Sequence, residues 1–297
     1  TSDGKYLHTG RIEKGVLQTG VSVKASVDAR RRRSIERNHT TTHLIHRALR
    51  NVLGSHVNQA GSFVGPDRLR FDFTHFSAMS PSEIERVEDE VNQKILENLP
   101  VSANEMDINE AKKLGATALF DEKYGNVVRV ISVGNYSMEL CGGTHLKSTS
   151  QACLVKIVSE SGVAAGTRRI EALTGEAAIG YFKEKEKQLN DTAAALKTAP
   201  QDTVRKAELL NTEIKNAEKE IERLRNKLIS GNIDSLLSNA LEIKGVKVIA
   251  AHLEQLDIEA LRNTGDLIRN KIGSGVVVLA SSHEGKVSFV AMATKDV

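Results

Sequence analysis

Apolar residues recur at helical spacing in two stretches of the first third of the chain. In residues 34–54 the pattern carries Ile35, Leu44 and Ala48, and a second stretch over residues 81–96 combines the same spacing with an acidic, solvated face. Ser34 is a suitable N-cap for the first stretch, and Gly54 suits the position just after its last turn. The pattern therefore predicts one helix in each stretch.

The residues before the first predicted helix have a different pattern. Gly10, Gly15 and Gly20 separate short runs that are rich in β-branched residues. Such runs with glycine between them are typical of short strands joined by turns. We therefore expect residues 1–33 to form a β-rich opening segment.

Three further stretches also have the pattern of strands. Alternating apolar residues within 57–76 predict a hairpin, and residues 127–133 and 136–140 predict two strands joined by a glycine-containing turn. Strands and helices alternate here without a regular βαβ rhythm. The sequence therefore predicts one α+β domain over residues 1–182, with its core over 34–182.

Residues 183–230 contain no glycine and are rich in Lys, Glu, Ala and Leu. Apolar residues follow a heptad-like spacing there, at Ile214, Ala217, Ile221, Leu224 and Leu228. Pro200 interrupts the stretch, and proline inside a helix costs roughly 3 kcal/mol. We therefore expect two helices that fold into an antiparallel hairpin and serve as a linker.

The last stretch, residues 231–297, returns to a mixed pattern. The pattern predicts three strands, over residues 246–253, 276–280 and 287–292, and one helix over residues 257–272. One helix on three strands makes a thin core for a segment of this length. We expect a small α/β C-terminal domain that is incomplete.

Composition indicates an ordinary globular protein and does not identify a binding partner. Hydrophobic residues make up 40% and charged residues 27%, which is typical of globular proteins. The formal net charge of +3 is too mild to identify a polyanionic partner. Two cysteines are too few for a disulfide framework. The sequence has no apolar run of about 18 residues and no signal-peptide pattern. We expect a cytoplasmic protein with no membrane partner, and a chain that begins with Thr1 rather than Met is expected to be part of a longer protein.

Two pairs of residues carry the strongest chemical signal. His39 and His43 stand four residues apart on the first predicted helix, so both imidazoles lie on one face. Cys141 and His145 flank a Gly-Gly turn that lets the backbone fold closely around an ion. Together the pairs supply three nitrogen donors and one sulfur donor, the number and type that Zn²⁺ favours. The sequence therefore predicts a zinc site.

The spacing excludes two familiar kinds of zinc site. A zincin has Glu directly after the first histidine of the helix, where this chain has Thr40. A zinc finger needs its ligand pairs close in sequence, whereas about 100 residues separate these. Donors from distant elements suit a catalytic pocket as well as a structural staple, and either all four donors bind together or one gives way to water.

These residues, with three further segments, carry a specific resemblance. The segments are residues 57–62, residues 69–73 and the run 159–172 that contains Gly166-Thr-Arg-Arg169. Together with the two ligand pairs they resemble the editing domain of bacterial-type alanyl-tRNA synthetases over residues 1–182. The helical stretch and the last segment resemble the linker and the start of the C-terminal domain of the same enzymes. The resemblance implies hydrolysis of tRNA(Ala) mischarged with serine or glycine, with zinc as cofactor.

Two parts of the family's enzymes have no counterpart in this sequence. It has no class II aminoacylation core, and it ends before the glycine-rich run expected in the C-terminal domain. We therefore expect editing without charging of tRNA. Homodimer formation, a trait of the missing part of the family's C-terminal domain, is in doubt for this chain.

Four further residues are candidates for contact with the substrate. Thr42 could bond the hydroxyl of serine, or instead bond a carbonyl of its own helix. Gln59 resembles the family's pocket glutamine and could hold substrate or water, or be a turn residue. The N–H groups of Gly142 and Gly143 could face a developing oxyanion, although a tight turn alone explains two glycines equally well.

Arginines are the candidates for contact with RNA phosphates. The run Arg30, Arg31, Arg32 and Arg33 could follow the acceptor stem or form a solvated edge. Arg169 is expected to be a structural or phosphate contact, and His46 a packing residue beside the site.

Two other functions compete with alanine-specific editing. The editing domain of threonyl-tRNA synthetases shares both ligand pairs, although the downstream helices favour the alanyl family. A binding module, in which zinc only staples a tRNA-binding fold, would hold tRNA without turnover.

Overall fold

The computed structural model describes residues 7–117, 125–283 and 285–297, apart from the side chains of residues 225, 226, 228–230 and 232. Contacts divide the chain into two compact units, Thr1–Gln188 and Leu189–Val297. The boundary falls inside the helix α4 (Gly175–Ala195). The mixed α+β class expected from the sequence is confirmed. The division into three domains at residues 182 and 230 stays a prediction.

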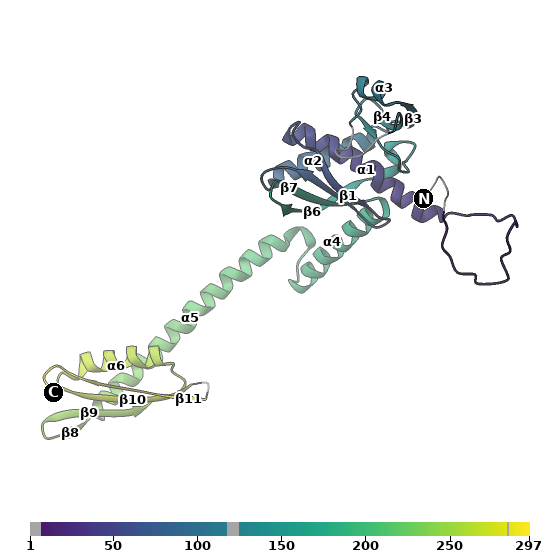
Figure 1. Ribbon diagram of the computed structural model, residues 1–297. Helices are drawn as coiled ribbons and strands as arrows, with labels where there is room; N and C mark the ends of the chain where they lie inside the picture. The colour runs from purple at the N-terminus through teal and green to yellow at the C-terminus, as the bar shows by residue number, and fades with distance from the viewer. Residues whose placement is uncertain (1–6, 118–124, 284) are drawn as a thin grey trace. The chain divides into compact units, whose positions relative to one another are not determined.

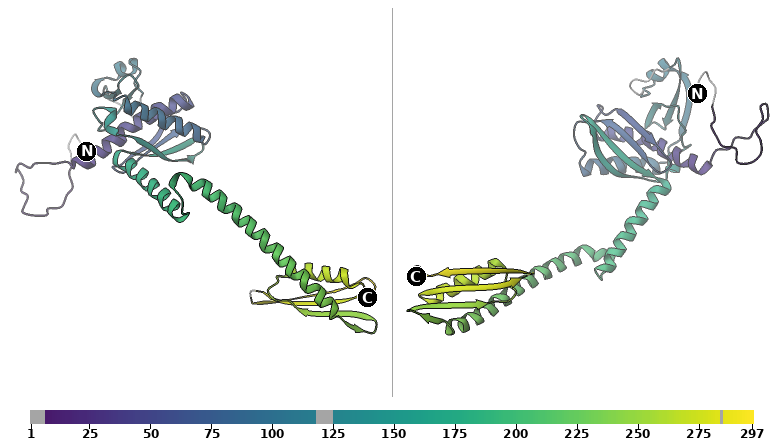
Figure 2. Two further views of the ribbon diagram at one scale, coloured as in Figure 1. Left: turned by 180° about the vertical axis from the view of Figure 1, so that it is seen from behind. Right: turned by 60° about the horizontal axis from the view of Figure 1, so that its bottom comes forward.

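The first unit is built on a four-stranded antiparallel sheet of order β1-β2-β7-β6. Its strands are β1 (Gln59–Val64), β2 (Leu69–Thr74), β6 (Val155–Ala164) and β7 (Thr167–Thr174). Two helices, α1 (Ala29–Leu53) and α2 (Pro81–Leu96), pack on one face of this sheet (Figures 1 and 2). Leu44, Ile45 and Leu49 of α1 meet Phe71 and Ile170 of the sheet in a fully buried core.

A smaller antiparallel sheet of order β3-β4-β5 lies in the same unit. It contains β3 (Val101–Asp107), β4 (Val127–Val133) and β5 (Ser137–Leu140), with the short helix α3 (Ile108–Lys113). Val128, Val130 and Leu140 form its small core with Ala111 of α3. The loop that follows β5 carries the second pair of predicted metal ligands.

Several predicted elements of this unit are confirmed. The hairpin within 57–76 is β1 and β2, the helix over 81–96 is α2, and the two strands around the turn at Gly134 are β4 and β5. Helix α2 begins at the cap Ser80, whose side chain and that of Glu83 satisfy each other's backbone N–H groups. Strands β3, β6 and β7 were not anticipated as strands.

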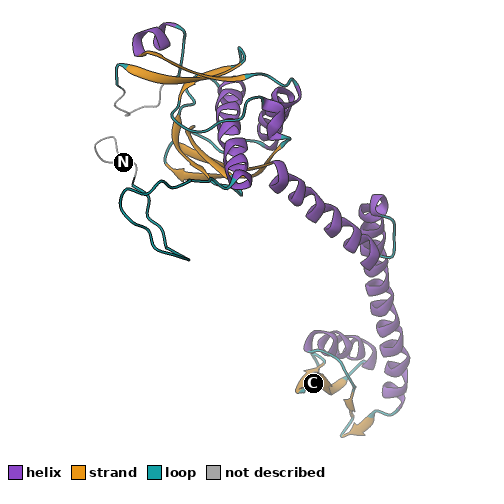
Figure 3. Ribbon diagram, turned by 90° about the vertical axis from the view of Figure 1, so that its right-hand side faces the viewer, coloured by secondary structure: helices purple, strands orange, loops and turns teal. Residues whose placement is uncertain are grey.

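The prediction of a β-rich opening segment is wrong for the part of residues 1–33 that the structure describes. Residues 7–28 contain no strand, and α1 already begins at Ala29 (Figure 3). Asp28, not Ser34, is the N-cap, since its side chain accepts the backbone N–H of Arg31. Arginine is a good helix former, so the arginine run extends the helix, and Ser34 donates its hydroxyl to the carbonyl of Arg30 inside it.

The second unit contains the long helix α5 (Thr203–Ser238), which follows a 3-10 turn at Pro200–Asp202. Pro200 therefore separates two helices as predicted, although α4 begins earlier and α5 ends later than expected. The heptad residues Ile214, Ile221 and Leu224 are 56%, 52% and 46% exposed, and Leu228 lies outside the described side chains. The antiparallel pairing of α4 and α5 stays a prediction.

The rest of this unit is a four-stranded sheet of order β11-β10-β9-β8 with one helix. The elements are β8 (Leu241–Ile243), β9 (Val246–His252), α6 (Ile258–Ile272), β10 (Gly275–His283) and β11 (Lys286–Ala293). Strands β9 and β10 are parallel, with α6 as the crossover between them. Ile233 near the end of α5 packs into this core, so the core is larger than one helix on three strands. No helix among the described residues is long and apolar enough to cross a membrane.

Candidate metal centre

The four predicted metal ligands lie together in the first unit. His39 and His43 project from one face of α1, and Cys141 and His145 come from the loop after β5. One nitrogen or sulfur atom from each residue lies within 4.8 Å of the others. The sulfur of Cys141 is 3.4 Å from Nε2 of His39 and 3.4 Å from Nε2 of His145. This cluster could hold a metal ion.

Other side chains contact Nδ1 of His43 and Nδ1 of His145. Nδ1 of His43 lies 2.7 Å from Oε2 of Glu139, a carboxylate that is only 7% exposed. Nδ1 of His145 lies 3.2 Å from the hydroxyl of Thr40, which accepts the backbone N–H of Leu146. Such partners fix the ring orientation of metal-binding histidines and leave Nε2 for the metal. The surroundings of the cluster therefore fit a metal site.

Electrostatics favour the metal-binding forms of Cys141 and His145. Burial alone would raise the pKa of the Cys141 thiol, but hydrogen bonds with His145, His39 and His43 lower it to about 3. Burial, joined by the neighbouring His43 and His39, lowers the pKa of His145 to about 4. Cys141 is thus a thiolate and His145 a neutral imidazole at neutral pH, the forms that bind metals.

His43 and Glu139 form a buried pair behind the cluster. Burial opposes charge on His43, but Glu139 and Cys141 together raise its pKa to about 10. Burial likewise opposes charge on Glu139, whose pKa is held well below its usual range by His43 and His46. A proton on His43 between a carboxylate and a thiolate occupies the place of a cation. A divalent metal ion bound at Nε2 would displace that proton and, with one more positive charge, would neutralise the thiolate and the carboxylate together.

Neighbouring Gly142 and Gly143 differ in their contacts. A Cβ atom on Gly143 would overlap the ring of His39, so only glycine fits beside this ligand. Nothing lies within 4 Å of the corresponding position at Gly142. The N–H of Gly143 points to the sulfur of Cys141 at 3.4 Å, whereas that of Gly142 has no hydrogen-bond partner within the described ranges.

Thr42 and Gln59 have local hydrogen bonds. The hydroxyl of Thr42 donates to the carbonyl of His39 at 2.6 Å, and its side chain is nearly buried. The amide of Gln59 donates to the hydroxyl of Ser62 at 3.2 Å. His46 is 2% exposed, and its Nδ1 lies 3.2 Å from Oε1 of Glu139, so it supports the same carboxylate as His43.

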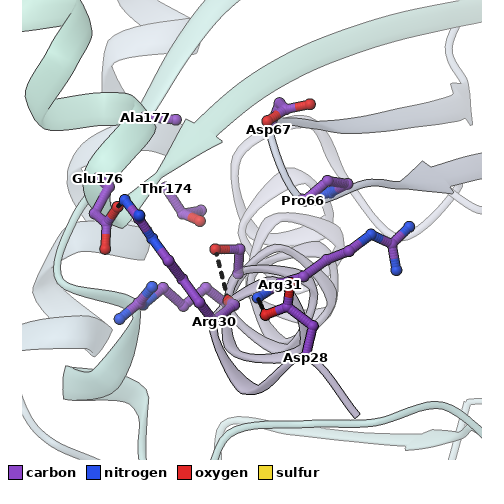
Figure 4. A pocket seen from close by; sticks show the side chains of 10 residues that line it. Asp28, Arg30, Arg31, Pro66, Asp67, Thr174, Glu176 and Ala177 are labelled. Atoms are coloured by element: carbon purple, nitrogen blue, oxygen red, sulfur yellow. Dashed lines mark hydrogen bonds and ion pairs between the residues drawn. The ribbon is translucent and has the colours of Figure 1, made fainter. Parts of the chain in front are cut away.

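The arginine run lies on the first turns of α1 and borders a cleft of about 430 Å³. Arg30 reaches across this cleft to Glu176 at 2.6 Å (Figure 4), and Arg33 lies 3.4 Å from both Gln151 and Glu36. The guanidinium groups of Arg31 and Arg32 have no ion pair among the residues that the structure describes. Two of the four arginines of this run are therefore without an ion-pair partner among the described residues.

Arg169 has a structural partner. It stands opposite Asp72 in the β2–β7 pairing and binds both carboxylate oxygens, at 2.7 and 2.9 Å. The hydrogen bonds from Arg169 and the charge of Arg70 hold the pKa of Asp72 below its usual value, against the effect of burial. Arg169 thus has a contact inside the protein, and its contact with phosphate stays a prediction.

Sequence reasoning did not identify three residues that support the cluster, namely Glu139, Thr40 and Arg129. Nη1 of Arg129 on β4 donates to the carbonyls of Cys141 and Gly143, at 3.0 and 2.6 Å. The one available signal was position, because Glu139 stands two residues before Cys141 and Thr40 directly follows His39. No local pattern in the sequence connects Arg129 with the loop.

Comparison with known proteins adds an independent line of evidence. Residues 128–171 match the family described as the threonyl and alanyl tRNA synthetase second additional domain. The whole chain is 67% identical to a segment of the alanine--tRNA ligase of Acetivibrio thermocellus and covers 34% of that protein. It is 48% identical over 291 residues to the alanine--tRNA ligase of Pelotomaculum thermopropionicum, of which it covers 33%.

The chain thus spans about one third of the length of these relatives. The matched segment 128–171 contains Cys141 and His145, and so includes half of the candidate metal cluster. The resemblance to alanyl-tRNA synthetases that the motifs indicated is confirmed, since the whole chain is similar to a segment of the alanine--tRNA ligase of Acetivibrio thermocellus.

Proposed function

We propose that this chain carries the editing centre of an alanine--tRNA ligase and hydrolyses Ser-tRNA(Ala) and Gly-tRNA(Ala). The observation that carries the proposal is the convergence of His39, His43, Cys141 and His145 within 4.8 Å. Its setting in a chain that matches alanine--tRNA ligases over its whole length supports the alanyl family over the threonyl alternative. We also propose that the protein acts in the cytoplasm, where tRNA is charged.

Zinc is the metal that best fits three imidazoles and one thiolate. When bound, it would supply a Lewis acid that can orient the substrate or polarise water. An aminoacyl ester is a labile bond, so positioning of water is sufficient and no covalent nucleophile is needed.

The chain's own groups would place the substrate around this centre. Thr42 uses its hydroxyl proton on the carbonyl of His39, so its oxygen remains able to accept a hydrogen bond from the hydroxyl of serine. The N–H of Gly142 is the free one of the loop and is the better candidate for an oxyanion, because Gly143 donates to Cys141. The amide of Gln59 would have to leave Ser62 to hold substrate or water.

The test is deacylation by the purified, zinc-loaded chain. We expect hydrolysis of Ser-tRNA(Ala) and Gly-tRNA(Ala) and sparing of Ala-tRNA(Ala), since a site that bonds a hydroxyl discriminates against an analogue without one. That argument explains the hydrolysis of the seryl ester. It does not apply to the glycyl ester, whose hydrolysis the experiment measures. Equal hydrolysis of the seryl and alanyl esters would contradict the pocket proposed around Thr42.

The two cysteines offer a matched pair of variants. Cys141→Ala removes one donor and should lower the deacylation rate at least 10-fold, whereas Cys153→Ala changes an exposed thiol outside the cluster and should leave it unchanged. Retained binding of tRNA with no turnover by the wild-type chain would instead support the zinc-stapled binding module.

A further inference from the structure

A second cleft of the first unit adjoins the metal centre. It has a volume of about 300 Å³ and lies between the C-terminal half of α1 and the turn that joins β4 to β5. His46, Arg47 and Arg50 line it from the helix, and Glu139 and Tyr136 line it from the opposite side. This volume is at the lower end of the range for small-ligand sites.

The lining of this cleft is positively charged. Arg47 is exposed, and its guanidinium has no hydrogen bond or ion pair within the part of the chain that the structure describes. Arg50 uses only Nη1 for its contacts with the carbonyl of Val57 and the side chain of Asn58, at 2.9 and 3.2 Å. Glu139, the acidic residue of the lining, has its carboxylate oxygens 2.7 Å from Nδ1 of His43 and 3.2 Å from Nδ1 of His46. Two cations with free N–H groups therefore face the cleft, which favours an anionic ligand.

Two further polar side chains of the lining, those of Tyr136 and Ser137, already have hydrogen-bond partners. The hydroxyl of Tyr136 donates to Glu90 at 2.7 Å. A ligand bound here would meet the donors of the two arginines and, beside them, Nε2 of His46, which is buried and has no hydrogen-bond partner among the described residues. Phosphate, which offers only acceptor oxygens, matches such a lining.

The cleft is close to the metal centre along α1. Arg47 follows His43 by one helical turn, a rise of about 6 Å, and Glu139 lines the cleft and contacts His43. On the other side, Arg50 holds Asn58, the residue before the candidate Gln59. Groups of one polynucleotide end could therefore occupy the cleft and the metal centre together.

We infer that the cleft between α1 and the β4–β5 turn is a phosphate-binding subsite for the terminal nucleotides of an RNA substrate, with Arg47 as its free cation. This inference rests on the proposed function for the identity of the substrate. The exposed position of Arg47 at the cleft suits the charge of a strand that continues into solvent, whereas a small free anion would be held at its inner end.

Binding is measured directly, by fluorescence anisotropy of a labelled single-stranded RNA of about eight nucleotides that ends in CCA, with the zinc-loaded chain. We expect Arg47→Gln to weaken binding about fivefold and to reduce the slope of log K against log salt by roughly 0.7. Arg47→Lys keeps the charge and should retain most of the affinity. Arg86→Gln removes an equal charge from an exposed position of α2 and is the control.

Equal affinities of Arg47→Gln and Arg86→Gln for the RNA would overturn the inference. Inorganic phosphate is a separate arm: if its binding depends on Arg47 while RNA binding does not, the cleft holds a small anion and the inference is also wrong. Since Arg47 is exposed, Arg47→Gln should fold normally, and zinc content and thermal unfolding check this.

Hydrolysis of Ser-tRNA(Ala) separates the inference from the proposed function. We expect Arg47→Gln to raise KM about fivefold with kcat unchanged, because the contact is equally strong in the ground state and the transition state. If no variant hydrolyses the ester, the proposed function fails, and the Arg47-dependent RNA binding still decides the inference.

Discussion

Gly142 and Gly143 are adjacent in sequence but have opposite steric surroundings. A side chain at 143 would overlap the ring of His39, whereas a side chain at 142 would meet open space. Neither residue lies in the left-handed region of backbone conformation, so the difference is purely one of contact. The loop tolerates a methyl group at one position and not at the other.

Gly143→Ala should therefore displace His39 or the loop and weaken zinc binding at least 10-fold, whereas Gly142→Ala should bind zinc as the wild type does. Competition with a chromophoric chelator measures both affinities. Equal zinc affinities for the two variants would show that the loop can move away from α1 without loss of the site.

Arg129 holds the same loop from the side of β4. Because its Nη1 donates to two loop carbonyls, Arg129→Ala should lower zinc affinity about 10-fold, and Arg129→Lys should recover part of it. Arg68→Ala, which removes an exposed partner of Glu171 on the large sheet, is the control. Zinc affinity unchanged in Arg129→Ala would mean that α1 alone fixes the loop.

His75 should make the stability of the first unit depend on pH. Burial and the neighbouring His56 lower its pKa in the folded state below the usual 6.5, and its Nδ1 is hydrogen-bonded to His56 at 2.9 Å. The unfolded chain takes up a proton near pH 6.5 that the folded imidazole resists, so this residue lowers stability as pH falls below 6.5.

We expect the free energy of unfolding, measured by urea denaturation, to fall less between pH 7.5 and 5 in His75→Gln than in the wild type. His8→Gln changes an exposed histidine outside the core and is the control. A pH dependence identical in wild type and His75→Gln would assign the effect to other groups.

At the scale of elements, α1 is the rigid half of the metal centre and the loop after β5 is the other half. Ligands at positions 39 and 43 are placed by the helix period alone, since each projects from the same face of hydrogen-bonded backbone. The loop depends instead on Arg129, Thr40 and close packing against His39. We therefore expect changes in the loop to affect metal affinity more than changes in the exposed face of α1.

Helix α2 supports α1 and depends on its first turn. Ser80→Ala removes the cap and half of the reciprocal bonding with Glu83, which should cost about 1 kcal/mol and lower Tm by about 2–4 °C. Glu83→Gln keeps a side chain that can reach back and should have a smaller effect. Thermal unfolding followed by circular dichroism measures both, and an unchanged Tm in Ser80→Ala would show that packing alone fixes the start of α2.

At the scale of the molecule, the metal centre lies entirely within one of the two units. All four donors belong to Thr1–Gln188, and Leu189–Val297 has a separate core around α6. A bound ion stabilises only the unit that binds it. Removal of zinc by a chelator should lower the Tm of the first unit and leave that of the second unchanged.

Differential scanning calorimetry with and without chelator tests this expectation. The Gly143→Ala variant should behave like the chelated wild type in both transitions. A single transition that shifts as a whole would show that the units unfold together.

Much of the local structure was predictable because its causes are local. The apolar spacing of α1 and α2, the turn at Gly134 and the proline before α5 act over a few residues, and each element was expected. Strands β3, β6 and β7 were not expected, and the opening segment was wrongly expected to be β-rich. The β-branched runs of that segment match strands, but in the described residues no partner strand covers them, and Val16 and Val23 are 85% and 70% exposed. A strand depends on hydrogen bonds to another strand, which a local pattern cannot supply.

The sequence by itself was enough to select the four candidate metal donors, because each pair is held by a short spacing on a helix or in a turn. Only the tertiary structure decided that the pairs meet, since about 100 residues separate them and their approach depends on how the small sheet packs beside α1. The same packing places Glu139 behind His43, Arg129 across the loop and Arg47 at the second cleft. Contacts of this kind join residues that are distant along the chain, so no periodicity or local motif records them.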